Sequence, residues 1–132
     1  MRYWAMNKFS KEKVMLLQKL IVESSGGTYG VRDFALLESA LESAFQTFDG
    51  VELYPTKEEK AARLGIGLIA NHAFLDGNKR TGLLVMDSFL AINGMPLEYT
   101  DDEFIQIGFA LAKNQMTYQE LLEWIKTHKK VF

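Results

Sequence analysis

The chain has 132 residues, of which 48% are hydrophobic and 24% charged, and its formal net charge is −2. This composition excludes an intrinsically disordered chain, and the absence of cysteine excludes disulfides, cysteine zinc sites and thiol catalysis. Proteins that bind nucleic-acid backbones usually carry a clear basic excess, so nucleic acid is not an expected partner.

The first half of the chain predicts two helices separated by a glycine-rich segment. The first helix is predicted over residues 10–24 and the second over residues 34–48, with Asp33 as its N-cap. The apolar side chains of the second helix fall on one face, namely Phe34, Leu37, Leu41, Ala44, Phe45 and Phe48. Between the helices, residues 24–31 (SSGGTYGV) suit either a mobile loop or a small β-hairpin.

The second half predicts four more helices, over residues 57–72, 78–93, 101–113 and 118–129. Three of them begin with a T-x-x-E capping box, in which Thr and Glu satisfy two backbone N–H groups that would otherwise be unpaired. These boxes are Thr56 with Glu59, Thr100 with Glu103, and Thr117 with Glu120. Asn93-Gly94, followed by Pro96, ends the helix over residues 78–93. We therefore expect an all-α fold of about six helices with a small flap at residues 24–31.

No linker, repeat or low-complexity run divides the chain, so we expect a single domain over residues 1–132. The N-terminal residues contain no apolar run of signal-peptide length, and the longest apolar stretch is too short to cross a bilayer. These features favour a cytoplasmic protein that does not associate with a membrane.

A polar stretch, NHAFLDGNKRT at residues 71–81, lies between two apolar helices. The N-terminus of the second of these helices presents unpaired N–H groups and a partial positive charge. Lys79 and Arg80 lie in its first turn, where the helix dipole normally disfavours cations. Two adjacent cations in this position indicate an anion that attracts both the side chains and the N–H groups, as in a phosphate site.

Asp76 and His72 add two further groups to the same stretch. A carboxylate beside a phosphate requires a divalent ion between them, and Mg²⁺ binds in proteins through one or two carboxylates together with substrate phosphates. With a reference pKa of about 6.5, a histidine at position 72 could take a proton from an entering hydroxyl near neutral pH. Structural explanations stay open: a satisfied histidine at a helix end, an Asp-Gly turn, and a solvated Lys-Arg pair.

The segment HAFLDGNKR, residues 72–80, resembles the signature of the Fic/Doc family, H-x-F-x-[DE]-[AG]-N-[KG]-R, at every specified position. Three further segments resemble family sequence: GVRDFALLESAL (30–41), ELYPTKEEKAA (52–62) and FLAINGMPL (89–97). The resemblance implies an all-helical bundle in which the signature lies in a loop between two central helices.

Within this family, members that transfer AMP carry Gly between the signature Asn and Arg, and a second Arg three residues further on. This chain has Lys79 and Leu83 at those two positions, a pattern similar to that of the Doc (death-on-curing) toxins. The resemblance to Doc toxins implies transfer of the ATP γ-phosphate to a threonine of elongation factor Tu, which arrests translation.

The resemblance also assigns roles to individual residues. His72 would be the general base that acts on the target hydroxyl, and Asp76 would bind Mg²⁺. The phosphates of ATP would be held by Asn78, Lys79 and Arg80, assisted by the backbone N–H groups of Gly77 and Asn78.

The glycine-rich segment at residues 24–31 would be the flap that aligns the target by strand pairing. Its proposed contact residues are Gly26, Gly27, Thr28, Tyr29 and Gly30. The alternative is that this segment simply connects two helices.

Fic proteins are often held inactive by a helix with the motif [ST]-x-x-x-E-[GN], which this sequence lacks. The resemblance to Doc toxins implies neutralisation by the C-terminal helical segment of a separate antitoxin. Two other hypotheses remain beside a Doc-type kinase. The first is a nucleotidyltransferase that adds AMP to a hydroxyl side chain, and the second is a non-catalytic Fic-fold protein that only binds a partner.

Overall fold

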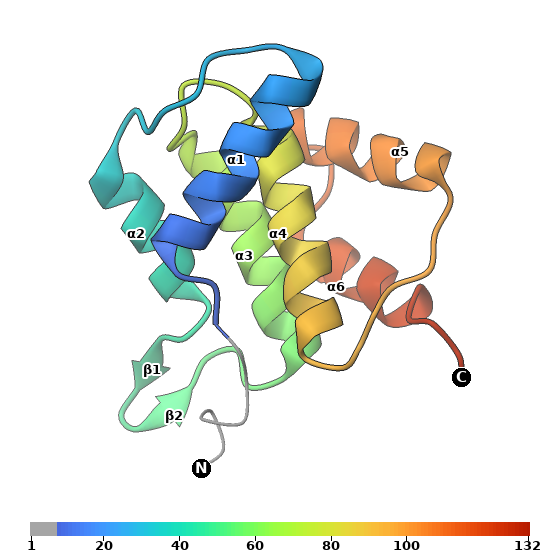
Figure 1. Ribbon diagram of the computed structural model, residues 1–132. Coiled ribbons are helices and arrows are strands. Elements are labelled where there is room, and N and C mark those ends of the chain that lie inside the picture. The colour runs from blue at the N-terminus through green and yellow to red at the C-terminus, as the bar shows by residue number, and fades with distance from the viewer. Residues whose placement is uncertain (1–7) are drawn as a thin grey trace.

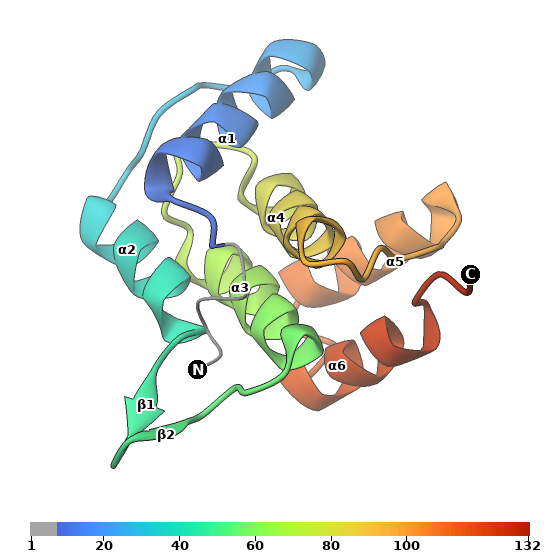
Figure 2. The same cartoon turned by 60° about the horizontal axis from the view of Figure 1, so that its bottom comes forward.

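The computed structural model describes residues 8–132, so residues 1–7 of the predicted single domain lie outside the described part. It contains six helices in the described residues: α1 (Lys11–Ser25), α2 (Phe34–Ser43), α3 (Lys57–Asn71), α4 (Asn78–Ile92), α5 (Asp101–Ala112) and α6 (Tyr118–Thr127). The predicted all-α fold and its helix count are therefore confirmed. Helices α3 and α4 lie at the centre, with α1 and α2 on one side and α5 and α6 on the other (Figures 1 and 2).

None of the helices in residues 8–132 combines the length and the apolar character that crossing a bilayer requires.

The helix starts follow the capping signals in the sequence. All three T-x-x-E boxes form, and in the box of α3 the Glu59 N–H donates to Thr56 Oγ1 at 3.1 Å while the Thr56 N–H donates to Glu59 Oε1 at 3.1 Å. Asp33 caps α2, because its Oδ1 accepts from the Leu36 N–H at 3.1 Å. These bonds join residues only three positions apart, so the start of each of these helices is set locally and not by tertiary packing.

Helices α3 and α4 approach closely because glycines face each other across their contact. A Cβ added to Gly82 would lie 2.7 Å from Ile69 Cγ1 and 3.1 Å from the Gly65 carbonyl oxygen. On the other flank of α3, a Cβ at Gly67 would meet Ala40 of α2 at 3.4 Å. Helix α3 ends at Asn71 and α4 begins at Asn78, so a short loop connects them, residues 72–77, here called the motif loop.

The small sheet lies outside residues 24–31, for which the sequence allowed either a loop or a hairpin. Strands β1 (Thr47–Phe48) and β2 (Val51–Glu52) form an antiparallel hairpin around Asp49 and Gly50, which both have positive φ. The Asp-Gly turn favours a hairpin, and it ends α2 at Ser43 instead of the predicted residue 48. The hairpin precedes the N-terminus of α3, at the opposite end of that helix from the motif loop (Figure 1).

The predicted flap, residues 24–31 and here called the flap segment, contains no hairpin. Its first two residues complete α1, and residues 26–29 have no regular structure. Gly26, Gly27 and Gly30 have φ values of 89°, 114° and 143°, which disfavour a regular strand pair within the segment. The segment instead forms an isolated antiparallel bridge from Val31 to Phe74 of the motif loop. It is therefore a loop that runs along the motif loop.

A fully buried lysine ties the hairpin to the core. Lys60 of α3 is 0% exposed, and its Nζ donates to Glu52 Oε1 at 2.6 Å and to the Tyr54 carbonyl oxygen. The same ammonium lies 5.3 Å from the centre of the Phe45 ring. Because a buried charge without a partner is strongly destabilising, Glu52 is needed to keep this part of the core intact.

We predict that Glu52→Ala destabilises the fold by about 3 kcal/mol, the lower end of the range for removing one partner of a buried pair, because the Glu52 side chain is about a third exposed. Lys60→Met should cost less, since the remaining carboxylate can turn into water. Urea unfolding followed by circular dichroism gives both values.

The double variant Glu52→Ala/Lys60→Met removes the buried ammonium together with its carboxylate. It should be more stable than Glu52→Ala alone, in which the ammonium stays buried without that partner. Equal stability of the double variant and Glu52→Ala would mean that the buried ammonium does not need its carboxylate.

Candidate active site

The histidine of the motif loop has a fixed backbone and an exposed side chain. His72 is the C-cap of α3 and has left-handed backbone angles, φ 48° and ψ 48°. Arg32 Nε donates to the His72 carbonyl oxygen at 2.8 Å, and Arg32 Nη2 donates to the Asn71 carbonyl oxygen at 3.2 Å. The N–H groups of Arg32 and Asp33 also donate to the Ala73 carbonyl oxygen, at 2.7 and 3.1 Å. These bonds hold the backbone from which the exposed imidazole projects.

The motif loop is held closed by the first residue of α4, Asn78. Asn78 Oδ1 accepts from the Phe74 N–H at 2.9 Å, while Asn78 Nδ2 donates to the Phe74 carbonyl oxygen at 3.0 Å. Phe74 is 1% exposed, so its ring fixes the loop to the core. The Asn78 side chain is therefore occupied by the main chain of Phe74. Only the backbone N–H of Asn78 is available to bind a ligand.

The N-terminus of α4 has free donors. Its N-cap, Gly77, has φ 74° and provides no side-chain cap. The backbone N–H groups of Asn78, Lys79 and Arg80 make no hydrogen bond to the residues that the structure describes. A Cβ at Gly77 would make only ordinary van der Waals contact with Val22 Cγ1 of α1, at 3.5 Å, so it is the positive φ that favours glycine here. The uncapped end of a long helix is suited to an anion.

The carboxylate of the motif loop lies against the flap segment. The Thr28 N–H donates to Asp76 Oδ2 at 2.7 Å, and a Cβ at Gly27 would lie 3.2 Å from Asp76 Cβ. The Leu75 N–H donates to the Gly30 carbonyl oxygen at 3.0 Å. Within residues 8–132, Asp76 Oδ1 has no hydrogen-bond partner. The structure thus brings Gly27, Thr28 and Gly30 of the predicted flap against the motif loop. A Cβ at Gly26 would meet nothing within 4 Å, and the Tyr29 ring lies 5.9 Å from Lys19 Nζ of α1.

Asp76 fits a magnesium site of the kind that substrate phosphates complete. The described residues contain no cluster of three or more His, Asp or Glu side chains that could hold a metal by themselves. A single hard carboxylate with one free oxygen, next to an uncapped helix N-terminus, suits Mg²⁺ that is bound partly through phosphate.

The two cations of the signature point in different directions. Arg80 is exposed, and its Nη1 donates to Ser25 Oγ at the end of α1. Lys79 Nζ lies 4.1 Å from the centre of the Phe109 ring on α5. Successive residues on an α-helix point in different directions, so helix geometry separates the two side chains, but the sequence does not show which elements they meet.

An apolar groove of about 480 Å³ begins at these two cations and runs between α1, α4 and α5. Leu83 lies in this groove and is 4% exposed. A Cβ on Gly108 of α5 would be only 2.9 Å from Leu83 Cδ1. The groove is lined by Ile21, Lys79, Arg80, Leu83, Leu84, Phe104, Ile105, Gly108 and Phe109.

Sequence reasoning missed two residues that hold the site, Arg32 and Gln18. Gln18 is 0% exposed on α1 and bonds both the flap segment and the motif loop. A signal for it exists in the sequence. Val14, Gln18 and Val22 are spaced by four residues, so they share one face of the helix, and a glutamine on an otherwise apolar face needs a buried partner.

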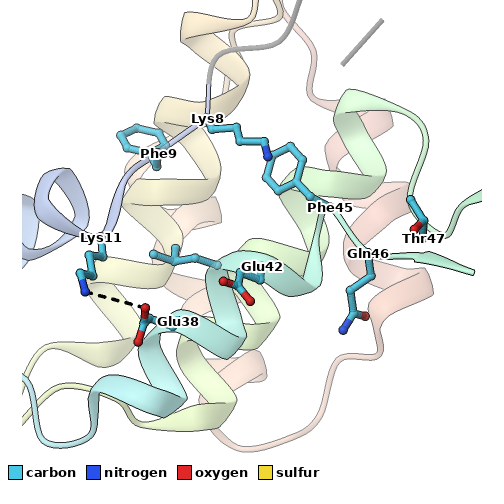
Figure 3. Close-up of a pocket in the computed structure, with 9 residues that line it drawn as sticks. Lys8, Phe9, Lys11, Glu38, Glu42, Phe45, Gln46 and Thr47 are labelled. Atoms are coloured by element: carbon cyan, nitrogen blue, oxygen red, sulfur yellow. Dashed lines mark ion pairs between the residues drawn. The ribbon is translucent and has the colours of Figure 1, made fainter. Parts of the chain in front are cut away.

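A second hollow, of about 570 Å³, lies between the start of α1 and the outer side of α2 (Figure 3). Lys11 Nζ lies 3.7 Å from Glu38 Oε2 at its rim, and Lys8 Nζ lies 4.3 Å from the centre of the Phe45 ring. The hollow shares no residue with the motif loop or with the flap segment. It is therefore separate from the candidate active site.

Comparison with known proteins agrees with this geometry. The model of the Fic/DOC family matches residues 8–90. A curated relative, "Toxin Doc" of Mycolicibacterium smegmatis, is 46% identical over 72 residues, which cover 54% of this chain and 55% of the relative. The match thus spans about half the length of that relative. Because the family match covers more than half of the chain and includes the whole motif loop, the chain belongs to the Fic/DOC family.

Proposed function

We propose that this protein is a Doc-type toxin that transfers the γ-phosphate of ATP to a hydroxyl side chain of a target protein. The observation that carries the proposal is the grouping, in one short loop, of an exposed imidazole, a carboxylate with a free oxygen and an uncapped helix N-terminus. The similarity to a protein named "Toxin Doc" supports the toxin assignment. By the same proposal the target is a threonine of elongation factor Tu, so the toxin acts in the cytoplasm and arrests translation.

In this mechanism His72 accepts the proton of the target hydroxyl as the oxygen attacks the γ-phosphorus. A new bond forms between that oxygen and phosphorus, the bond to the bridging oxygen of ADP breaks, and ADP leaves. The bonds from Arg32 to the carbonyl oxygens of Asn71 and His72 hold the main chain that carries the imidazole. Proton transfer by a positioned histidine contributes roughly a hundredfold to ten-thousandfold in rate.

The phosphates would be held by the N-terminus of α4 together with the two cations. The backbone N–H groups of Gly77 and Asn78 and the side chains of Lys79 and Arg80 supply the donors. Lys79 must leave the Phe109 ring to do so, and a partly exposed cation–π contact of this kind costs only about 0.5–1 kcal/mol to break. Magnesium bound at Asp76 would neutralise part of the phosphate charge.

The apolar groove beside Lys79 and Arg80 is the proposed docking site for a helical segment of a cognate antitoxin. Ile105 and Phe109 of α5 line this groove and are 54% and 49% exposed. An amphipathic helix placed there would bury its apolar face, and acidic side chains on it would reach the two cations. Such a partner would cover both cations that are proposed to hold ATP.

Nucleotidyl transfer is the competing reaction, and the surroundings of Leu83 count against it. An arginine is required at this position by the AMP-transferring pattern, but the Leu83 side chain is buried against Gly108. An arginine there would need to place a guanidinium between two packed helices. The Leu83→Arg substitution would therefore destabilise the fold, so Lys79 offers the cleaner test of the two reactions.

We predict that His72→Ala lowers phosphoryl transfer to elongation factor Tu by at least about a hundredfold while ATP still binds. The reason is that the loop loses its base but keeps the bonds of Arg32, which go to backbone atoms. Transfer is measured with labelled ATP, and binding by calorimetry.

His128→Ala is the matched control, because it removes the other histidine of the chain, on the distant α6 end, and should leave the rate unchanged. Wild-type turnover by folded His72→Ala protein would exclude histidine from the mechanism.

We also predict that Lys79→Gly loses phosphoryl transfer without gaining strong AMP transfer, because Leu83 still supplies no second guanidinium. Intact-mass measurement of elongation factor Tu after incubation with ATP separates the two products directly. Lys113→Gly removes the other ammonium near the Phe109 ring, 5.8 Å from its centre, and should behave like the wild type. The addition of AMP by the unsubstituted protein would overturn the kinase proposal.

A further inference from the structure

The amide of Gln18 makes three hydrogen bonds, two from its nitrogen and one to its oxygen. Its Nε2 donates to the Thr28 carbonyl oxygen at 3.1 Å and to the Asp76 carbonyl oxygen at 3.0 Å. Its Oε1 accepts from the Gly30 N–H at 3.2 Å. The side chain is 0% exposed, so water cannot replace any of these partners.

These bonds form a closed ring with the carboxylate of the motif loop. Gln18 holds the carbonyl oxygens of Thr28 and Asp76, and the Thr28 N–H holds Asp76 Oδ2 at 2.7 Å. Both the main chain and the carboxylate of Asp76 are therefore fixed, one by α1 and the other by the flap segment. The oxygen without a partner, Oδ1, is the one whose direction this ring sets.

A ring of this kind makes the flap segment and the carboxylate move together. A displacement of Thr28 must either break its bond to Asp76 or rotate the carboxylate, and Gln18 resists both because it bonds to each residue. The neighbours of Gln18 on the same helix face, Val14 and Val22, are apolar and buried, so they offer it no alternative partner.

We propose that Gln18 is a positioning residue that aims the Asp76 carboxylate at the divalent metal and couples it to the flap segment. This rests on the proposed function in one respect, namely that Asp76 binds the metal that accompanies ATP. Gln18 itself touches neither metal nor substrate. Partners that orient metal ligands in this way typically contribute about 10–100-fold to metal affinity.

The test measures binding without turnover. The dissociation constant of ATP is determined by calorimetry with and without Mg²⁺, and the ratio of the two values is the metal-dependent gain. In Gln18→Met, which keeps the size of the side chain but loses its polar atoms, this gain should fall about tenfold or more. Gln18→Asn keeps the amide but is one methylene too short to reach all three partners, so it should lose less of the gain.

Val14→Ala is the matched control, because Val14 is equally buried on the same face of α1 and leaves a cavity without touching the ring of hydrogen bonds. It should lose stability, as Gln18→Met does, and keep the metal-dependent gain. A wild-type gain in folded Gln18→Met or Gln18→Asn, or an equal loss in Val14→Ala, would overturn the positioning role.

Asp76→Asn separates this inference from the proposed function. When Asp76→Asn abolishes the metal-dependent gain, the metal assignment stands and the Gln18 variants report on positioning. A wild-type gain in Asp76→Asn would mean that Asp76 does not bind the metal, and both the metal assignment and the role of Gln18 would then fail. A loss in Asp76→Asn with no loss in the Gln18 variants removes only the role of Gln18.

Discussion

The motif loop has to satisfy its backbone hydrogen bonds without any regular structure of its own, and much of the site depends on how it does so. It connects two central helices, its residues Ala73 and Phe74 are buried, and an unpaired buried carbonyl or N–H is costly. The pairing groups come from three places. Arg32 covers the end of α3, Asn78 closes the loop on Phe74, and Gln18 reaches Asp76 from α1.

Because Arg32, Asn78 and Gln18 pair with the main chain of the loop, the groups that can bind or react with a substrate are left free. The His72 imidazole is exposed, Asp76 Oδ1 has no partner in the described residues, and the first N–H groups of α4 have none either. Helices α3 and α4 pack closely because Gly82 has no side chain. The imidazole, the carboxylate and the N–H groups therefore lie in the motif loop or next to it. Rigid support and free reactive groups are thus two results of the same packing.

The helices could be predicted because their signals are local, as the three capping boxes illustrate. The motif loop could be predicted because its residues are contiguous. For the hairpin two local signals conflict: Asp49-Gly50 favours a turn, while Phe48 continues the apolar spacing of α2 past the end of that helix. The contacts of Lys79 with Phe109 and of Arg80 with Ser25 involve segments distant in sequence, which no local pattern encodes. Glu52 lies only eight positions before Lys60, but their pairing depends on the hairpin.

The bonds that complete the site join residues far apart along the chain, and this bears on when the site forms during folding. Gln18 and Asp76 are separated by 58 positions, and Thr28 and Asp76 by 48. In contrast, α3 and α4 are consecutive and joined by a short loop, so they can pair early at a low entropic cost of loop closure. A chain in which only these two helices have paired contains every residue of the signature. It gains the bonds to Asp76 only when α1 and the flap segment dock.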